Sequence, residues 1–303
     1  MNPHPICTSH GHDVPAELLA FMRDSAPLLD DPAGLRARME EDGYLYLHDV
    51  LDREAVYNAR IEILSKLASV GEFKEPLNEG LSTGTSTRGE MISDLGAFWQ
   101  AVCEGLALRT VTHDGRIVEI MTALIGEPVR SYDFLWLRTM HPGRASAFHF
   151  DHVYMNRGTD RVYTVWTPLG DVALEEGPLL LVEGSHRWTD LHDEFRGLDV
   201  DRDKSRPGHV TLDPVSLARE RNTRLLTAEF RAGDVVIMPM FMLHGSLDNR
   251  STRGRVRISC DTRYQPAAEP IDERWVGSPP IAHGQSYASM GGAKPATSDP
   301  LFR

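Results

Sequence analysis

Short aromatic and β-branched segments dominate the chain from Val129 onward, and they constrain its fold more than any other feature. Gly, Pro and Asn residues separate these segments, as is typical of turns between strands. Strands that follow one another without intervening helices favour a sandwich or barrel over alternating βαβ units. The segments are 129–143, 147–155, 161–169, 178–184, 228–240 and 254–264.

The first part of the chain is expected to be mostly helical. Residues 31–43 begin with Asp and Pro and end with Gly, which is the usual order of helix boundary signals. Residues 52–71 form an amphipathic pattern that opens with an aspartate, whereas 44–50 alternates like a strand. Further helices are predicted over 91–107 and 115–127.

These patterns predict an α+β, mainly β protein that folds as one domain, because no repeat or low-complexity linker divides the chain. A polar segment interrupts the strands, and an insertion of this length is usually either functional or disordered. We expect it to be a lid. The predicted parts are a flexible N-terminus (1–14), a single domain (15–290) with a helical part (about 15–128), a strand-rich core (about 129–275) and the lid-like insertion (about 186–226), and a tail (291–303).

Composition excludes several classes of partner. The net charge of −12 argues against nucleic acid and anionic membranes, since both are bound through clustered Lys and Arg. No stretch reads as a leader or approaches the roughly 18 apolar residues of a membrane span. The three cysteines are widely spaced and odd in number, which favours a reducing cytoplasm. A small molecule is therefore the expected partner, and the oligomeric state is left open.

The tripeptide His149-Phe150-Asp151 is a candidate for metal ligation. On a strand over 147–153, residues i and i+2 share a face, so the imidazole and the carboxylate would project together. A His-x-Asp is expected about once by chance in such a chain, so other residues must support it. His244 follows the predicted strand at 233–239. Two histidines and one carboxylate define the site of non-haem Fe(II) oxygenases.

The strand after His244 carries polar residues at every second position. Arg255, Arg257, Ser259 and Asp261 are predicted on one face, with apolar residues on the other. A guanidinium can hold a carboxylate through two hydrogen bonds, so arginines on the metal side indicate an anionic ligand.

Taken in order, "HFD", "GPLLLVEGSHR" and "HGSLDNRSTRGRVRIS" resemble the phytanoyl-CoA dioxygenase family of Fe(II)/2-oxoglutarate oxygenases, from about residue 43 to about 274. The resemblance implies a double-stranded β-helix (jelly roll) with flanking helices and with His149, Asp151 and His244 as iron ligands. It places the 2-oxoglutarate arginine eleven residues after the distal histidine, at Arg255. Arg253 and Arg257 are the alternatives.

Two further residues resemble cosubstrate contacts of the family. Ser246 lies two residues after His244, and Trp166 lies in the strand that follows the His-x-Asp. A place in the core is an equally good interpretation of Trp166. The family's N-terminal cosubstrate contacts have no evident counterpart, and 82–91 is the segment in which we would search for them.

The resemblance implies that Fe(II), 2-oxoglutarate and O2 together oxidise a C–H bond, with release of succinate and CO2. Halogenating relatives lack the iron carboxylate, so Asp151 favours hydroxylation, with desaturation, epoxidation or ring closure as alternatives. A zinc-type hydrolase or isomerase on the same three ligands is the rival function, and it would need no arginine. The complete residue set disfavours a binding protein without catalysis. The acidic charge disfavours a CoA thioester and favours a small metabolite, with secondary metabolism as the expected setting.

Overall fold

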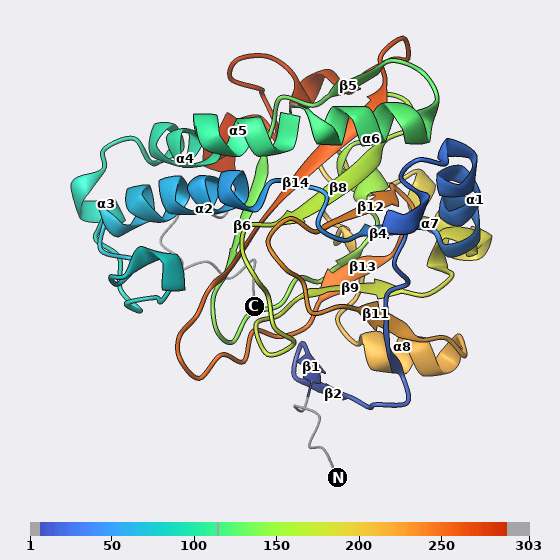
Figure 1. Ribbon diagram of the computed structural model, residues 1–303, viewed down its shortest axis with the longest axis horizontal. Coiled ribbons are helices and arrows are strands. Elements are labelled where there is room, and N and C mark those ends of the chain that lie inside the picture. The colour runs from blue at the N-terminus through green and yellow to red at the C-terminus, as the bar shows by residue number, and fades with distance from the viewer. Residues whose placement is uncertain (1–6, 114, 290–303) are drawn as a thin grey trace.

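Two facing β-sheets form the centre of the computed structural model, which describes residues 7–113 and 115–289 (Figure 1). All named strand pairs are antiparallel except β11 with β3. The first sheet has the order β10 (His209–Thr211), β7 (Phe148–His149), β13 (His244–Ser246), β9 (Leu179–Val182), β11 (Leu225–Thr227), β3 (Leu19–Phe21). The second has the order β4 (Leu45–Leu47), β12 (Val235–Pro239), β8 (Tyr163–Pro168), β14 (Arg257–Pro266), β5 (Val129–Ser131), and β6 (Trp136–Met140) also pairs with β14.

Alternate residues of the two sheets face each other across a shared core. Tyr46, Trp166 and Val236 of the second sheet belong to one buried cluster with Leu179 and Leu181 of the first. Leu179 and Leu181 are two residues apart on β9, and the pleat of a strand turns every second side chain to the same face. Two packed sheets of this kind are the jelly roll that the sequence predicted.

Helices cover the outer face of the second sheet. Ile63, Trp99 and Met121 of these helices share a buried cluster with Val165 and Ile258 of the sheet. Figure 1 shows them gathered on one side of the molecule. The helices are α2 (Arg53–Ala68), α4 (Leu95–Cys103), α5 (Leu106–His113) and α6 (Arg116–Ile125), with α1 (Pro32–Asp42) beside β4 and a short α3 (Arg88–Met91). The predicted helices over 31–43, 52–71, 91–107 and 115–127 correspond to α1, α2, α4 and α6, whereas α3 and most of α5 were not predicted.

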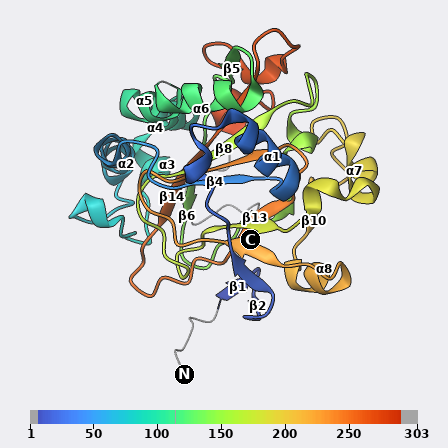
Figure 2. The same cartoon turned by 45° about the vertical axis from the view of Figure 1, so that its right-hand side comes forward.

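The insertion predicted as a lid contains regular structure. Phe195 and Val215 from its two helices join a buried cluster with Phe148, Leu180 and Val182 of the first sheet. The helices thus cover the outer face of that sheet, and Figure 2 shows them on the side away from α2, α4 and α5. The elements of the insertion are α7 (Thr189–Arg196), β10, α8 (Pro214–Glu220) and β11.

The N-terminal segment differs from the flexible terminus that the sequence predicted. The hairpin of β1 (Cys7–Ser9) and β2 (His12–Val14) packs against the first sheet. Ser9 donates a hydrogen bond to the carbonyl of Ser246 at 2.8 Å, and the carboxylate of Asp248 accepts from two backbone N–H groups of the turn. These partners are more than two hundred residues away in sequence, so no local pattern reveals them. Residues 1–6 and the predicted tail over 291–303 lie outside the described residues.

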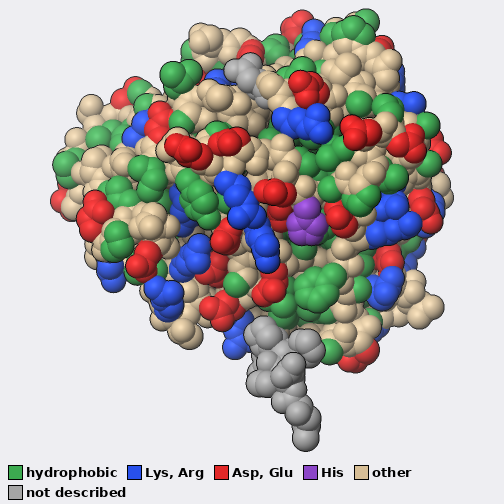
Figure 3. Space-filling model, in the orientation of Figure 1, with side chains coloured by type: hydrophobic (Ala, Val, Ile, Leu, Met, Phe, Trp, Pro, Cys, Tyr) green, Lys and Arg blue, Asp and Glu red, His purple; other side chains and the backbone are tan. Residues whose placement is uncertain are grey.

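Acidic and basic side chains are interspersed on the face shown in Figure 3. Among the described residues, ion pairs such as Arg224 with Glu183, at 2.6 Å, join exposed side chains of opposite charge, and other ion pairs lie within the core. Within the described part of the chain, we find no helix with the length and apolar character needed to cross a membrane.

Candidate metal centre

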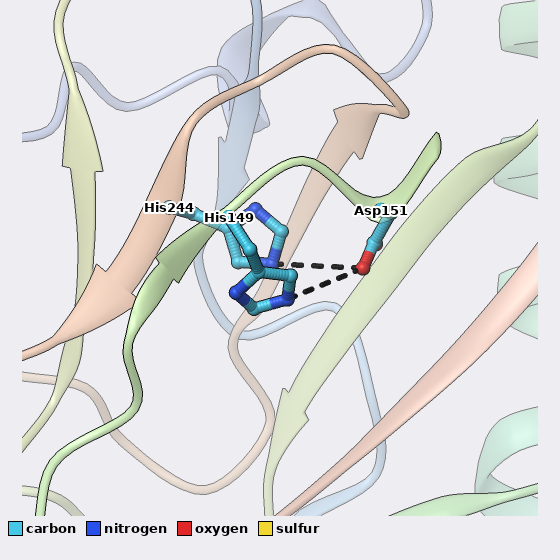
Figure 4. A group of neighbouring side chains, drawn as sticks. All are labelled: His149, Asp151 and His244. Atoms are coloured by element: carbon cyan, nitrogen blue, oxygen red, sulfur yellow. Dashed lines mark ion pairs between the residues drawn. The ribbon is translucent and has the colours of Figure 1, made fainter. Parts of the chain in front are cut away.

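Two histidines and one aspartate converge between the sheets. His149 ends β7, His244 begins β13, and the two are direct partners in the antiparallel register. Oδ1 of Asp151 lies 3.5 Å from Nε2 of His149 and 3.8 Å from Nε2 of His244 (Figure 4). One ligand atom from each of the three residues lies within 4.8 Å of the other two, so the three could hold a metal ion together. They are the group of this kind found among residues 7–113 and 115–289.

The backbone at this site differs from the predicted strand over 147–153. β7 ends at His149, and Asp151 opens the 3-10 turn η3 (Asp151–Tyr154), so strand alternation does not explain the convergence. The turn directs the carboxylate toward the second sheet, where Thr164 and Arg263 bond to its Oδ2. Phe150, between the two ligands in sequence, is fully buried in the cluster on the outer side of the first sheet.

Backbone carbonyls fix the orientation of both imidazoles. Nδ1 of His149 lies 2.8 Å from the carbonyl of Ala147, and Nδ1 of His244 lies 2.9 Å from that of Met242. A carbonyl only accepts hydrogen bonds, so each Nδ1 carries a proton, and the neutral form of each imidazole has its lone pair on Nε2. Metal-binding histidines commonly show this arrangement, in which the second nitrogen is held by an acceptor.

Electrostatics give Asp151 and His244 the protonation states of metal ligands. Burial alone would raise the pKa of Asp151, but Arg263, followed by His244 and His149, holds that pKa well below its usual range. Burial, followed by the neighbouring His149, lowers the pKa of His244 to about 4. At neutral pH the aspartate is therefore ionised and His244 is neutral, as coordination requires.

A narrow pocket extends from the two histidines along β14. It is lined by Arg138, Ser146, His149, Trp166, Leu179, His244, Gly245, Arg257 and Asp261. Arg257 is 3% exposed and forms no ion pair with any described residue, although its Nη1 donates to Ser259 Oγ at 2.5 Å. Burial and the nearby Arg138 lower the pKa of Arg257 only to about 10, so its guanidinium is charged at neutral pH. A buried, unpaired guanidinium is costly, and an anion bound in the pocket would offset that cost.

The structure does not bring Arg255 into this pocket. Its Nε lies 3.3 Å from Oε1 of Glu176, its Nη2 donates to the carbonyl of Asp171, and its side chain is 28% exposed. Arg255 precedes the first residue of β14, in a segment bridged to Leu81, whereas Arg257 lies on the inward face of the strand. Strand alternation pointed to both arginines and did not distinguish them.

Of the two residues predicted to contact the cosubstrate, Trp166 lines the pocket and Ser246 does not. Trp166 lines the pocket and its ring centroid lies 5.9 Å from the guanidinium of Arg257, while the indole also packs on Phe230. Oγ of Ser246 accepts a hydrogen bond from the backbone N–H of Ser146 at 2.8 Å. The serine hydroxyl therefore supports the loop that forms one wall of the pocket.

The segment 82–91, where we would search for further cosubstrate contacts, lies elsewhere. Ser82 to Ser86 line a separate cavity of about 370 Å³ together with Glu72, His141 and Arg144. That cavity shares no lining residue with the pocket at the histidines.

Four polar residues lie at the metal centre although the sequence analysis assigned them no role in the site. Arg138 donates to Asp261 at 2.8 Å, and both line the pocket. Arg263 and Thr164 bond to Asp151. Alternation along 255–261 had already placed Asp261 on the metal-side face without assigning it a role, and the same alternation continued by two residues is the signal that could have identified Arg263 as inward-facing.

Comparison with known proteins relates most of the chain to one family. The family model described as phytanoyl-CoA dioxygenase (PhyH) matches residues 39–257. The 1-deoxypentalenic acid 11-beta-hydroxylase of Streptomyces exfoliatus is 28% identical over 257 residues, which cover 81% of this chain and 85% of the relative. The enzyme of the same name from Streptomyces arenae is 28% identical over 259 residues, with the same coverage.

Solved structures share the fold at low sequence identity. The α-ketoglutarate-dependent epimerase SnoN from nogalamycin biosynthesis matches with a TM-score of 0.53 and 21% identity, covering 90% of this chain and 94% of SnoN. EctD from S. alaskensis with 2-oxoglutarate and 5-hydroxyectoine matches with a TM-score of 0.56 and 16% identity, covering 88% of this chain and 90% of EctD. These similarities support the jelly-roll assignment.

Proposed function

The chain belongs to the phytanoyl-CoA dioxygenase family and is an Fe(II)- and 2-oxoglutarate-dependent oxygenase, and we propose that it hydroxylates a C–H bond of a small organic molecule. The observation that carries the proposal is the buried, charged Arg257 in the pocket of the His-Asp-His group. A divalent metal on the group and an anionic cosubstrate on the arginine account for both features. The rival zinc-type hydrolase or isomerase leaves Arg257 without a role, and the family match does not favour it.

His149, Asp151 and His244 would hold the iron, because their free Nε2 atoms and one carboxylate oxygen face one another. Two histidines and one carboxylate leave positions open for other ligands. When bound, iron and 2-oxoglutarate supply the activation of dioxygen, with succinate and CO2 as coproducts.

Arg257, rather than Arg255, would hold the distal carboxylate of 2-oxoglutarate. Its guanidinium is already ordered by Ser259 and lies beside the indole of Trp166, so little side-chain freedom is lost on binding. Trp166 would form an apolar wall for the cosubstrate carbon chain. Ser246 would act indirectly, by holding the backbone of Ser146 at the pocket wall.

We propose hydroxylation over the other oxidations because Asp151 is retained as a ligand and because the matching relatives are named as hydroxylases. Desaturation, epoxidation and ring closure are outcomes that product analysis would distinguish. A small metabolite of secondary metabolism is the proposed substrate. The Arg138–Asp261 pair lines the pocket and is the polar feature that such a substrate would meet.

Within the insertion over 186–226, only the loop before β10 would act as a lid over the metal site. Its helices pack on the outer face of the first sheet, but β10 lies at the edge beside β7, with His209 opposite His149 in register. Closure of the loop before β10 would exclude water from the iron, which oxidative chemistry requires.

We also propose a cytoplasmic location. Cys103 and Cys260 are buried thiols in the core between the second sheet and its helices. A reducing compartment keeps such thiols in this state.

Succinate formation from 2-oxoglutarate under air, without added substrate, tests the proposal. We expect the enzyme to turn over 2-oxoglutarate slowly even without its substrate. Succinate release should therefore be slow, should require Fe(II) and should be lost in His244→Ala. Zn(II) in place of Fe(II) should give none. Activity toward a hydrolysable ester with Zn(II), and no succinate with Fe(II), would support the rival function instead.

A further inference from the structure

The two oxygens of Asp151 lie in different surroundings. Oδ1 faces Nε2 of both histidines, at 3.5 and 3.8 Å. Oδ2 points away from them, accepts a hydrogen bond from Nη2 of Arg263 at 3.0 Å and accepts another from the hydroxyl of Thr164. One oxygen is therefore available to a metal, while the other is occupied by the protein.

The two donors to Oδ2 are rigidly placed. Arg263 on β14 and Thr164 on β8 are direct partners in the antiparallel register, and each is 1% exposed. The guanidinium of Arg263 also lies 4.4 Å from the ring centroid of Trp136, where a cation on an aromatic face is favoured. Both donors thus reach the same oxygen from neighbouring strands whose positions the sheet fixes.

We infer that Arg263 and Thr164 are positioning residues that keep Asp151 a one-oxygen ligand of the iron. This inference rests on the proposed function. A carboxylate can bind a metal through one oxygen or two. With one oxygen from Asp151, two histidines and two donor atoms of 2-oxoglutarate, an octahedral metal keeps a position for dioxygen. A second oxygen from Asp151 would fill it.

A purely structural role is the competing interpretation, because a buried ion pair also anchors two strands to a turn. Loss of one partner of such a pair is strongly destabilising whatever its function. Arg60 provides a matched control, since it is 2% exposed and donates to the carbonyl of Leu169 at 2.9 Å, outside the metal pocket. Removing either arginine should lower the melting temperature.

The test uses nitric oxide as a probe of the open position, under anaerobic conditions, on the enzyme loaded with Fe(II) and 2-oxoglutarate. The variants are Arg263→Met, Arg263→Lys, Thr164→Val and the control Arg60→Met. We expect Arg263→Met to retain the visible Fe(II)–2-oxoglutarate band but to bind nitric oxide at least about 10-fold more weakly, by analogy with the roughly 10- to 100-fold losses of metal affinity or activity seen when residues that support metal ligands are replaced. Thr164→Val should show a smaller loss, Arg263→Lys should restore binding in part, and Arg60→Met should match wild type.

Wild-type affinity for nitric oxide in Arg263→Met and Thr164→Val, with only a lower melting temperature, would overturn the inference. Should Arg263→Met fail to fold, Thr164→Val decides alone, because it only exchanges a hydroxyl for a methyl group of similar size. Absence of the visible band in wild type would instead refute the proposed function, so the two failures are distinguishable.

Discussion

Replacing Arg257 with glutamine should weaken 2-oxoglutarate binding about 100-fold. Arg257 is buried, charged and without an acidic partner among the described residues, so the cosubstrate carboxylate would be its counterion. Removing one partner of a buried, hydrogen-bonded charge pair costs about 2–5 kcal/mol. Each 1.4 kcal/mol or so is tenfold in affinity, so a loss of about 3 kcal/mol raises the dissociation constant about 100-fold.

Arg255→Gln is the matched control on the same stretch of chain. Arg255 pairs with Glu176 at a partly exposed position, and pairs of that kind contribute about 0.2–1 kcal/mol. Because Arg255 does not line the pocket, and because about 1 kcal/mol corresponds to about fivefold, the dissociation constant for 2-oxoglutarate should change by less than about fivefold. The family spacing of eleven residues after the distal histidine predicts the opposite, namely a larger loss of 2-oxoglutarate affinity in Arg255→Gln than in Arg257→Gln.

Titration of 2-oxoglutarate into each anaerobic Fe(II) enzyme, followed by absorbance, measures both constants. Thermal unfolding of the metal-free variants checks that each one is folded. Near wild-type binding in Arg257→Gln together with a large loss in Arg255→Gln would refute the assignment drawn from the structure and restore the one drawn from the sequence.

Two further predictions concern stability. Burial, followed by Arg144 and Arg88, lowers the pKa of His141 to about 4, so between about pH 6.5 and 4 the unfolded chain binds more protons than the folded one. The free energy of unfolding should therefore fall by up to about 3 kcal/mol as the pH drops through that window. Measured by urea unfolding, it should depend less steeply on pH in His141→Gln than in wild type. The same pH dependence in both proteins would contradict this prediction. Asp248→Ala removes the acceptor for the N-terminal hairpin and should cost about 1 kcal/mol in urea unfolding without changing Fe(II) affinity, whereas an unchanged midpoint would show that the hairpin contributes nothing.

The sequence could predict that His149, Asp151 and His244 lie together, as the structure places them, because its evidence was chemical and ordered. His149, Asp151 and His244 are the residue types that bind iron, and they stand in segments whose strand character was evident. The reason given for their convergence was wrong in detail, since a 3-10 turn rather than strand alternation positions Asp151. The alternation of side chains along a strand does not reveal the residue at which the strand ends and a turn begins.

The arginine assignment shows where sequence reasoning reached its limit. Alternation placed Arg255 and Arg257 on the same face, but only the point at which β14 begins to pair decides which of them is inside. That point depends on the preceding loop and its bridge to Leu81, which are tertiary features. The N-terminal hairpin escaped prediction for the same reason, because its stabilising partners lie at the other end of the chain.

Anaerobic addition of Fe(II) and then 2-oxoglutarate, monitored for the weak visible metal-to-ligand charge-transfer band, tests the central claim most directly. We predict a band in wild type that needs both additions, persists in Arg255→Gln and is absent from His244→Ala. Fe(II) bound by wild type without any band on addition of 2-oxoglutarate would contradict the oxygenase assignment and favour hydrolytic or isomerase chemistry at the same three ligands.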